Sequence, residues 1–201
     1  MKTKLILIMA ALILTGSLFA DEITIFEGSC YRWNKTLKSL NGHEYWIRYE
    51  TETNKFYLKT YDFINTIWVE LDHSDIEKMR ETFTKYLEWE SKAVSEQVKI
   101  EKEIPESNIR TISMWKSSKY HQSNSAELAF LFFSQTKNWH QLVIFSNKMI
   151  SKDNEYIDCE IEGLYIDKED VELLLNGISE ENIKIKMDEY NELQKKEDMF
   201  N

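Results

Sequence analysis

Residues 66–97 join a strand to a long helix, and the predicted fold is built around them. The strand is Thr66-Ile67-Trp68-Val69-Glu70-Leu71, in which apolar and polar side chains alternate with the period of a sheet. A helical spacing of apolar side chains follows at Ile76, Met79, Phe83 and Val94. At about 1.5 Å per residue this helix is about 37 Å long, enough to cross a whole sheet. The stretch therefore predicts a sheet with one long helix packed against it.

The entry to this helix recurs near the end of the chain. Residues 71–79 (LDHSDIEKM) align without a gap on residues 166–174 (IDKEDVELL). In both copies an Asp stands at the N-cap position (Asp72 and Asp167), and a second Asp three residues later can reach back to the cap, as in a capping box. A duplicated acidic metal or ligand site is the alternative, but helix capping is the commoner use of such residues. The match favours two similar halves, residues 45–97 and 109–177.

The N-terminus has the pattern of a secretory signal peptide. Two lysines precede an apolar run from Leu5 to Leu14, and Ala20 closes the small-residue segment after it. The run is too short for a stable bilayer-spanning anchor. We expect residues 1–20 to be removed and the protein to be exported to the periplasm or the medium, with no stable membrane anchor afterwards. An uncleaved N-terminal anchor is the alternative.

The net charge of the chain excludes some classes of partner. Removal of residues 1–20 takes two lysines from a net charge of −10, which leaves −12. A chain this acidic should be repelled by nucleic acid and by anionic membrane surfaces. We therefore expect an unknown protein or a small ligand as the partner, and no nucleic acid. The remaining residues, 21–201, are enough for a single domain with its own core.

Two cysteines, Cys30 and Cys159, are present. In an exported protein an even number of cysteines favours a disulfide. A bridge between them would close a very long loop, for which the chain-entropy model gives about 4–5 kcal/mol of stabilisation. The sequence therefore predicts a Cys30–Cys159 disulfide, with two buried free thiols as the alternative.

Strand-like alternation dominates the rest of the chain. A polar loop is expected at residues 117–125, a helix end at Gly177, and a third helix capped by Ser179. Strand patterns cover residues 21–27, 45–51, 55–62, 66–71, 109–116, 126–134, 139–146 and 156–166. The order of strands then helix, found twice, predicts an α+β fold: antiparallel sheets covered by a long central helix and a C-terminal helical pair.

Motifs that carry chemistry are absent from the sequence. It has no nucleophile elbow and no glycine-rich phosphate loop, and its four histidines have no second ligand at metal spacing. Residues 153–158 partly match the sequence of a calcium-binding loop, but they lack its glycine and its distal glutamate. No pair among the many carboxylates is singled out by spacing. We therefore predict no catalytic residues, no metal and no cofactor.

Aromatic side chains on consecutive predicted strands give the one candidate site. Their alternation sets them on the face of the sheet opposite the core, where they could bind a protein, a glycan or an apolar ligand. The four residues are Trp46, Tyr57, Tyr61 and Trp68. Coverage of these side chains by a second element, as core, is the alternative.

The functional prediction is thus an exported, non-catalytic protein- or ligand-binding domain. Two alternatives stay open. One is a secreted carboxylate-dependent hydrolase, and the other is a carrier that encloses an apolar ligand between the sheet and the long helix.

Overall fold

The structure, a computed structural model, describes residues 22–34, 38–62 and 64–199. The predicted signal peptide, residues 1–20, lies outside the described residues. The strands are β1 (Glu22–Asn34), β2 (Ser39–Glu50), β3 (Lys55–Asp62), β4 (Asn65–Leu71), β5 (Glu101–Glu103), β6 (Ile109–Lys116), β7 (Tyr120–Ser134), β8 (His140–Ser146), β9 (Met149–Ser151), β10 (Asn154–Cys159) and β11 (Leu164–Asp167). The helices are α2 (His73–Glu96), α3 (Lys168–Gly177) and α4 (Glu180–Asp198).

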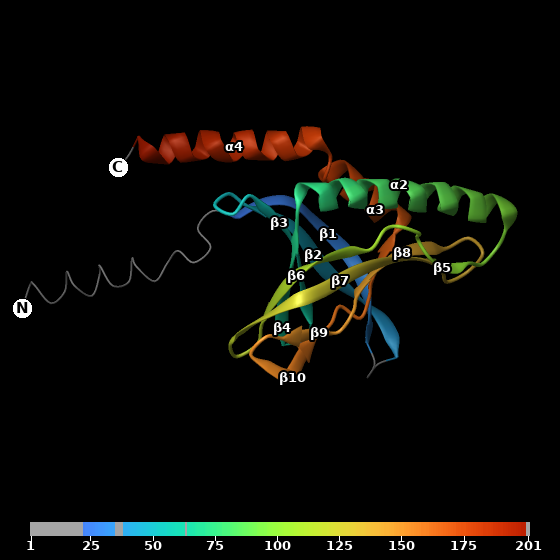
Figure 1. Cartoon of the computed structure of the whole chain (residues 1–201). Coiled ribbons are helices and arrows are strands. Elements are labelled where there is room, and N and C mark those ends of the chain that lie inside the picture. The colour runs from blue at the N-terminus through green and yellow to red at the C-terminus, as the bar shows by residue number, and fades with distance from the viewer. Residues whose placement is uncertain (1–21, 35–37, 63, 200–201) are drawn as a thin grey trace, which may run out of the picture.

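Eight of the strands form a closed antiparallel barrel (Figure 1). Strands β1, β2, β3, β4, β6, β7, β8 and β11 pair with their neighbours in chain order. The ring closes where β11 returns to β1, with Tyr165 opposite Tyr31. Strand β5 adds to β7 outside the ring, and β9 with β10 forms a separate hairpin.

The predicted α+β fold, an antiparallel sheet covered by helices, is therefore wrong. Alternation along each strand is the same in an open sheet and in a barrel, because both have one buried face. Closure depends on one pairing between strands whose partner residues, Tyr31 and Tyr165, are 134 positions apart. No local pattern reports such a pairing, so the sequence indicated the strands but not the ring they form.

Helix α2 lies across one end of the barrel instead of covering a sheet face (Figure 1). Its Phe83 ring lies 6.0 Å from that of Phe130, and its Tyr86 ring lies 5.5 Å from that of Phe132, both on β7. The Tyr86 hydroxyl donates to the backbone oxygen of His140 at 2.9 Å. We call the end of the barrel that α2 covers the helix end. The opposite end, with the β1–β2, β3–β4 and β6–β7 turns and the β9–β10 hairpin, is the turn end.

Both predicted helix starts are confirmed. Asp72 is the N-cap of α2, and the Asp75 carboxylate accepts from the Asp72 backbone N–H at 2.8 Å. Asp167 is the N-cap of α3, but its carboxylate has other partners: Oδ1 accepts from Trp139 Nε1 and from Gln141 Nε2, each at 2.8 Å. The repeated segment thus starts two helices, and in the second copy the capping aspartate also ties the helix to β8.

Helix α3 ends at Gly177, as predicted, and packs against β1. A Cβ at Gly177 would lie 2.3 Å from Cδ2 of Phe26, which real contacts do not allow. On the other side, a Cβ at Gly28 would lie 2.5 Å from the same Phe26 ring and 2.8 Å from Tyr45. These glycines are needed for close approach, because they let α3 and β2 pack around Phe26.

The predicted Cys30–Cys159 disulfide is wrong, since both cysteines are free and buried. Cys30 points inward from β1, and Cys159 ends β10 in the hairpin below the barrel. Burial raises the pKa of each thiol to about 12. An even cysteine count indicated a bridge, but each side chain fills its own place in the core.

Inside the barrel, the turn end is polar. Arg32 pairs with Asp62 at 2.8 Å, and His43 Nε2 lies 3.0 Å from Thr60 Oγ1. The polar loop predicted at residues 117–125 is only partly correct, because β7 begins at Tyr120. Its inward-facing positions 121 and 123 are His and Ser, and the His121 ring stacks on Trp115 at 5.5 Å.

Candidate functional site

The four predicted aromatic residues lie on the outer wall of the barrel. Trp46 on β2 is opposite Lys59 on β3, which in turn is opposite Trp68 on β4. The rings of Trp46 and Tyr61 meet edge to face at 5.3 Å, and Lys59 Nζ lies 5.6 Å from the Trp68 ring centre. Tyr120, which the sequence did not single out, lies 6.2 Å from Trp68. We call Trp46, Tyr57, Lys59, Tyr61, Trp68 and Tyr120 the aromatic strip.

Exposure is uneven along the aromatic strip. Tyr61 is 43% exposed and Tyr120 is 50% exposed, whereas Trp46 and Trp68 are each 8% exposed. Tyr57 is also buried, and its hydroxyl donates to Glu50 Oε2 at 3.2 Å. Only part of the predicted patch can therefore meet a partner directly, and the buried rings hold the exposed ones in position.

A groove of about 480 Å³ lies next to Tyr61 on the same outer wall. The barrel register explains it, since Tyr31 is opposite Gly42 and Ser29 is opposite Glu44, all on the outer face. Gly42 has no side chain, so it leaves a hollow between its neighbours. We call this the outer groove; its lining includes Ser29, Tyr31, Gly42, Glu44, Tyr61 and, from α3, Asp170.

The charges of the outer groove are negative. Neither the Glu44 nor the Asp170 carboxylate forms an ion pair or a hydrogen bond with another described residue. Partial burial raises the pKa of Asp170, and the nearby charges of Asp167 and Glu169 raise it further. The basic Arg32 is close by, but it donates to the Tyr61 backbone oxygen and to Asp62, each at 2.8 Å.

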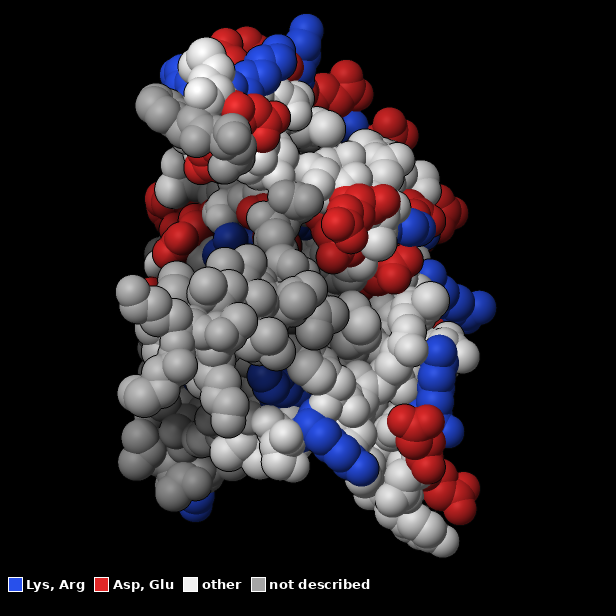
Figure 2. All heavy atoms as spheres, turned by 90° about the vertical axis from the view of Figure 1, so that its left-hand side faces the viewer, with Lys and Arg blue, Asp and Glu red and all other residues white. Residues whose placement is uncertain are grey.

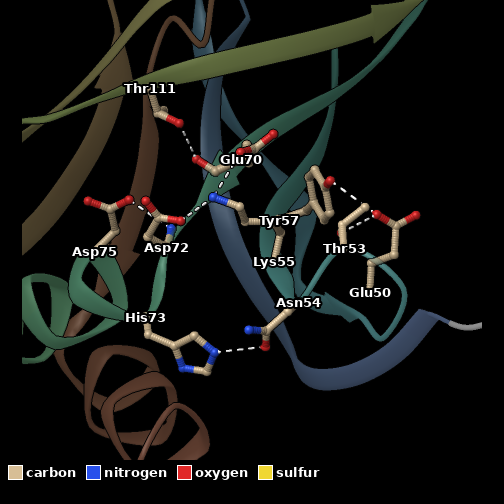
Figure 3. Close-up of polar contacts among 10 residues, drawn as sticks. All are labelled: Glu50, Thr53, Asn54, Lys55, Tyr57, Glu70, Asp72, His73, Asp75 and Thr111. Carbon is tan, nitrogen blue, oxygen red and sulfur yellow. Dashed lines mark hydrogen bonds and ion pairs between the residues drawn. The ribbon is translucent and has the colours of Figure 1, made fainter.

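A second polar cluster, near the start of α2, is structural (Figure 3). Lys55 pairs with Asp72, and with Glu70 at 3.3 Å. The α2 residue His73 contacts Asn54 of the β2–β3 turn, with Nε2 3.2 Å from Oδ1. These contacts connect the β2–β3 hairpin to α2. The carboxylates of Asp72 and Glu70 already have Lys55 as their partner.

A buried serine–histidine pair, Ser134 and His140, was not predicted from the sequence. Ser134 Oγ lies 2.7 Å from Nδ1 of His140, and His140 Nε2 lies 3.1 Å from the backbone oxygen of Lys137. Ser134 Oγ also accepts from the Ile100 backbone N–H at 2.9 Å. Because both histidine nitrogens have partners and both side chains are buried, this pair joins β7 to β8 and offers no nucleophile to a substrate.

Within residues 22–34, 38–62 and 64–199, no group of three or more His, Cys, Asp or Glu side chains is arranged to hold a metal ion. None of the helices described has the length and hydropathy needed to cross a membrane. Comparisons with protein-family models, with curated proteins and with solved structures gave no match to this chain.

Proposed function

We propose that this chain is an exported, non-catalytic binding protein that holds a protein or small-ligand partner on the outer wall of its barrel. The partner contacts the exposed part of the aromatic strip and the adjoining outer groove. One observation carries the proposal: Tyr61 is 43% exposed beside a groove of about 480 Å³, while an edge contact with Trp46 at 5.3 Å fixes its ring. Rigid aromatic side chains of this kind are common anchors at binding sites.

The distribution of charge supports this location. On the described part of the face in Figure 2, Asp and Glu side chains gather mostly in the upper half of the view, the side of the helix end. Exposed tyrosines and a tryptophan collect instead at the turn end, where Tyr31, Trp33, Tyr61 and Tyr120 lie. The net negative charge of the protein therefore attracts a cationic partner, and the exposed aromatic side chains at the turn end offer that partner apolar contacts.

A carboxylate-dependent hydrolase is the second candidate, and one observation favours it. The outer groove holds two carboxylates, and the pKa of one of them, Asp170, is raised. Two carboxyl groups in one groove are the residue types that general acid–base catalysis uses. In this case Glu44→Gln and Asp170→Asn would each abolish turnover of a hydrolysable substrate while leaving its binding nearly intact.

The carrier alternative receives less support from the barrel interior. Eight strands enclose a space just wide enough for side chains or for one small ligand. Large side chains occupy the inward positions and are fully buried, among them Tyr45, Phe56, Trp115 and Phe130. An apolar ligand inside the ring would have to displace them.

The test of the proposed function is native mass spectrometry of protein purified from its own compartment. We expect the wild-type protein to retain a bound partner, and the double variant Tyr61→Ala/Tyr120→Ala to lose it. Tyr156→Ala is the matched control, because Tyr156 is 86% exposed but belongs to β10. Equal retention by the double variant would contradict a site on the outer wall. The same purification reports whether the chain begins after residue 20, as the predicted signal-peptide cleavage requires.

A further inference from the structure

The outer groove combines two features that together select one class of ligand. Its walls include the phenol rings of Tyr31 and Tyr61, and its lining includes the carboxylates of Glu44 and Asp170. We infer that the outer groove binds a small organic cation, a quaternary or alkyl ammonium compound, with its charged nitrogen against the tyrosine rings. This inference rests on the proposed function and names the ligand class of the same surface.

The shape of the outer groove suits a ligand of this size. Its volume of about 480 Å³ falls within the range of about 300–1,000 Å³ usual for small-molecule sites. The floor is open at Gly42, where an added Cβ would meet no other atom within 4 Å. Since Tyr31 is the residue opposite Gly42, a ligand that fills this hollow lies directly beside the Tyr31 side chain.

The aromatic walls supply the first part of the recognition. The face of an aromatic ring carries negative charge density and attracts a cation that lies within about 6 Å of the ring centre. Tyr31 is 38% exposed and Tyr61 is 43% exposed, so both rings are accessible. The Trp46 ring holds Tyr61 from the side at 5.3 Å, so little side-chain entropy is lost on binding.

The two carboxylates supply the second part of the recognition. Glu44 comes from the strand next to Tyr31, and Asp170 comes from the first turn of α3, so two separate elements bring negative charge to one groove. The neighbouring Arg32 donates to Asp62 and to the Tyr61 backbone oxygen, each at 2.8 Å, and not to either carboxylate of the groove. An anion would meet two unpaired carboxylates, and a neutral apolar ligand would gain nothing from them.

The decisive experiment compares choline with 3,3-dimethylbutan-1-ol, which has the same shape but no charge. Each is titrated calorimetrically into the full purified protein at low ionic strength. We expect saturable binding of choline, and binding of the neutral alcohol weaker by about tenfold or more. Equal affinities, or no heat from choline, would overturn the inference.

Variants locate the site. We expect Tyr61→Ala, Tyr31→Ala and Glu44→Gln each to weaken choline binding by about fivefold. Tyr156→Ala should bind choline like the wild type, because its 86% exposed ring lies outside the outer groove. All variants are first matched for thermal unfolding. Unchanged choline affinity in the three groove variants would place the cation elsewhere and refute the proposal.

Failure of this inference and failure of the proposed function give different results. If choline does not bind but the Tyr61→Ala/Tyr120→Ala protein loses its natural partner, the outer wall is the binding surface and its ligand is not a cation. If choline binds and Tyr61→Ala abolishes binding, the cation site stands even where no partner is retained during purification.

Discussion

The two ends of the barrel differ in what fills them and in what surrounds them. At the helix end, α2 closes the barrel with aromatic rings that are almost completely buried, such as Phe83 against Phe130. At the turn end, the interior is polar, with His43, Arg32 and Asp62, while exposed tyrosines lie on the outside. We therefore expect the helix end to contribute most of the stability, and the binding surface that we propose lies at the turn end.

The largest loss of stability should come from a substitution in the core of the helix end. Phe130→Ala removes a ring that packs against Phe83 at 6.0 Å, and we expect it to cost about 3–5 kcal/mol of unfolding free energy. Tyr61→Ala, at the turn end, should cost less than about 1 kcal/mol, because that side chain is 43% exposed. Urea denaturation of both variants measures the difference. Similar losses would remove the distinction between the two ends.

The next effect concerns the contact between α2 and α3. Lys168 Nζ lies 3.0 Å from Glu90 Oε2, and the Glu90 side chain is 10% exposed. Lys168→Met leaves that carboxylate buried without its partner, so we expect a loss of about 1–3 kcal/mol. Glu90→Gln removes the charge itself and should cost less than Lys168→Met. The reverse order in thermal unfolding would show that the pair does not connect the helices.

A smaller effect on the stability of the fold should appear when the pH is lowered, and it should come from His43 at the turn end. Burial lowers the pKa of His43 below 6.5, and the Arg32 guanidinium lowers it further. The unfolded chain then takes up a proton more readily than the folded one, so the stability that His43 contributes is present above about pH 6.5 and is lost as the pH falls below it. We expect His43→Gln to reduce this acid-side loss, measured as urea midpoints between about pH 7.5 and pH 5. An identical pH profile in wild type and variant would contradict this account of the interior.

The next prediction concerns the reactivity of the two cysteine thiols. Because burial raises the pKa of both thiols to about 12, we expect neither Cys30 nor Cys159 to react with a thiol reagent in the folded protein at neutral pH. Both should react in denaturant without any reductant. Rapid labelling of the native protein, or no labelling in denaturant, would contradict the free buried thiols.

Local patterns predicted the helix starts and most of the strands. Asp72 and Asp167 stand at N-caps as expected, because capping depends only on residues within one turn. The expected helix from residue 73 to residue 97 ends one residue earlier in the structure, at Glu96. Such features need no knowledge of the rest of the chain.

Features that depend on distant contacts were missed. Closure of the barrel depends on Tyr31 and Tyr165, and the strand character of residues 120–125 depends on a polar interior that the sequence does not reveal. The candidate site divides in the same way. Trp46 and Tyr61 were found from alternation, whereas Glu44 and Asp170 come together only because α3 packs beside β1.

The most direct test of the account maps a ligand onto the two ends. Backbone amide resonances of the ¹⁵N-labelled protein are followed by NMR during a choline titration. We predict shifts at residues 29–31, 42–44 and 61, with α2 and α4 unchanged. Shifts confined to those helices at the helix end, or no saturable shifts at all, would contradict a binding surface at the turn end.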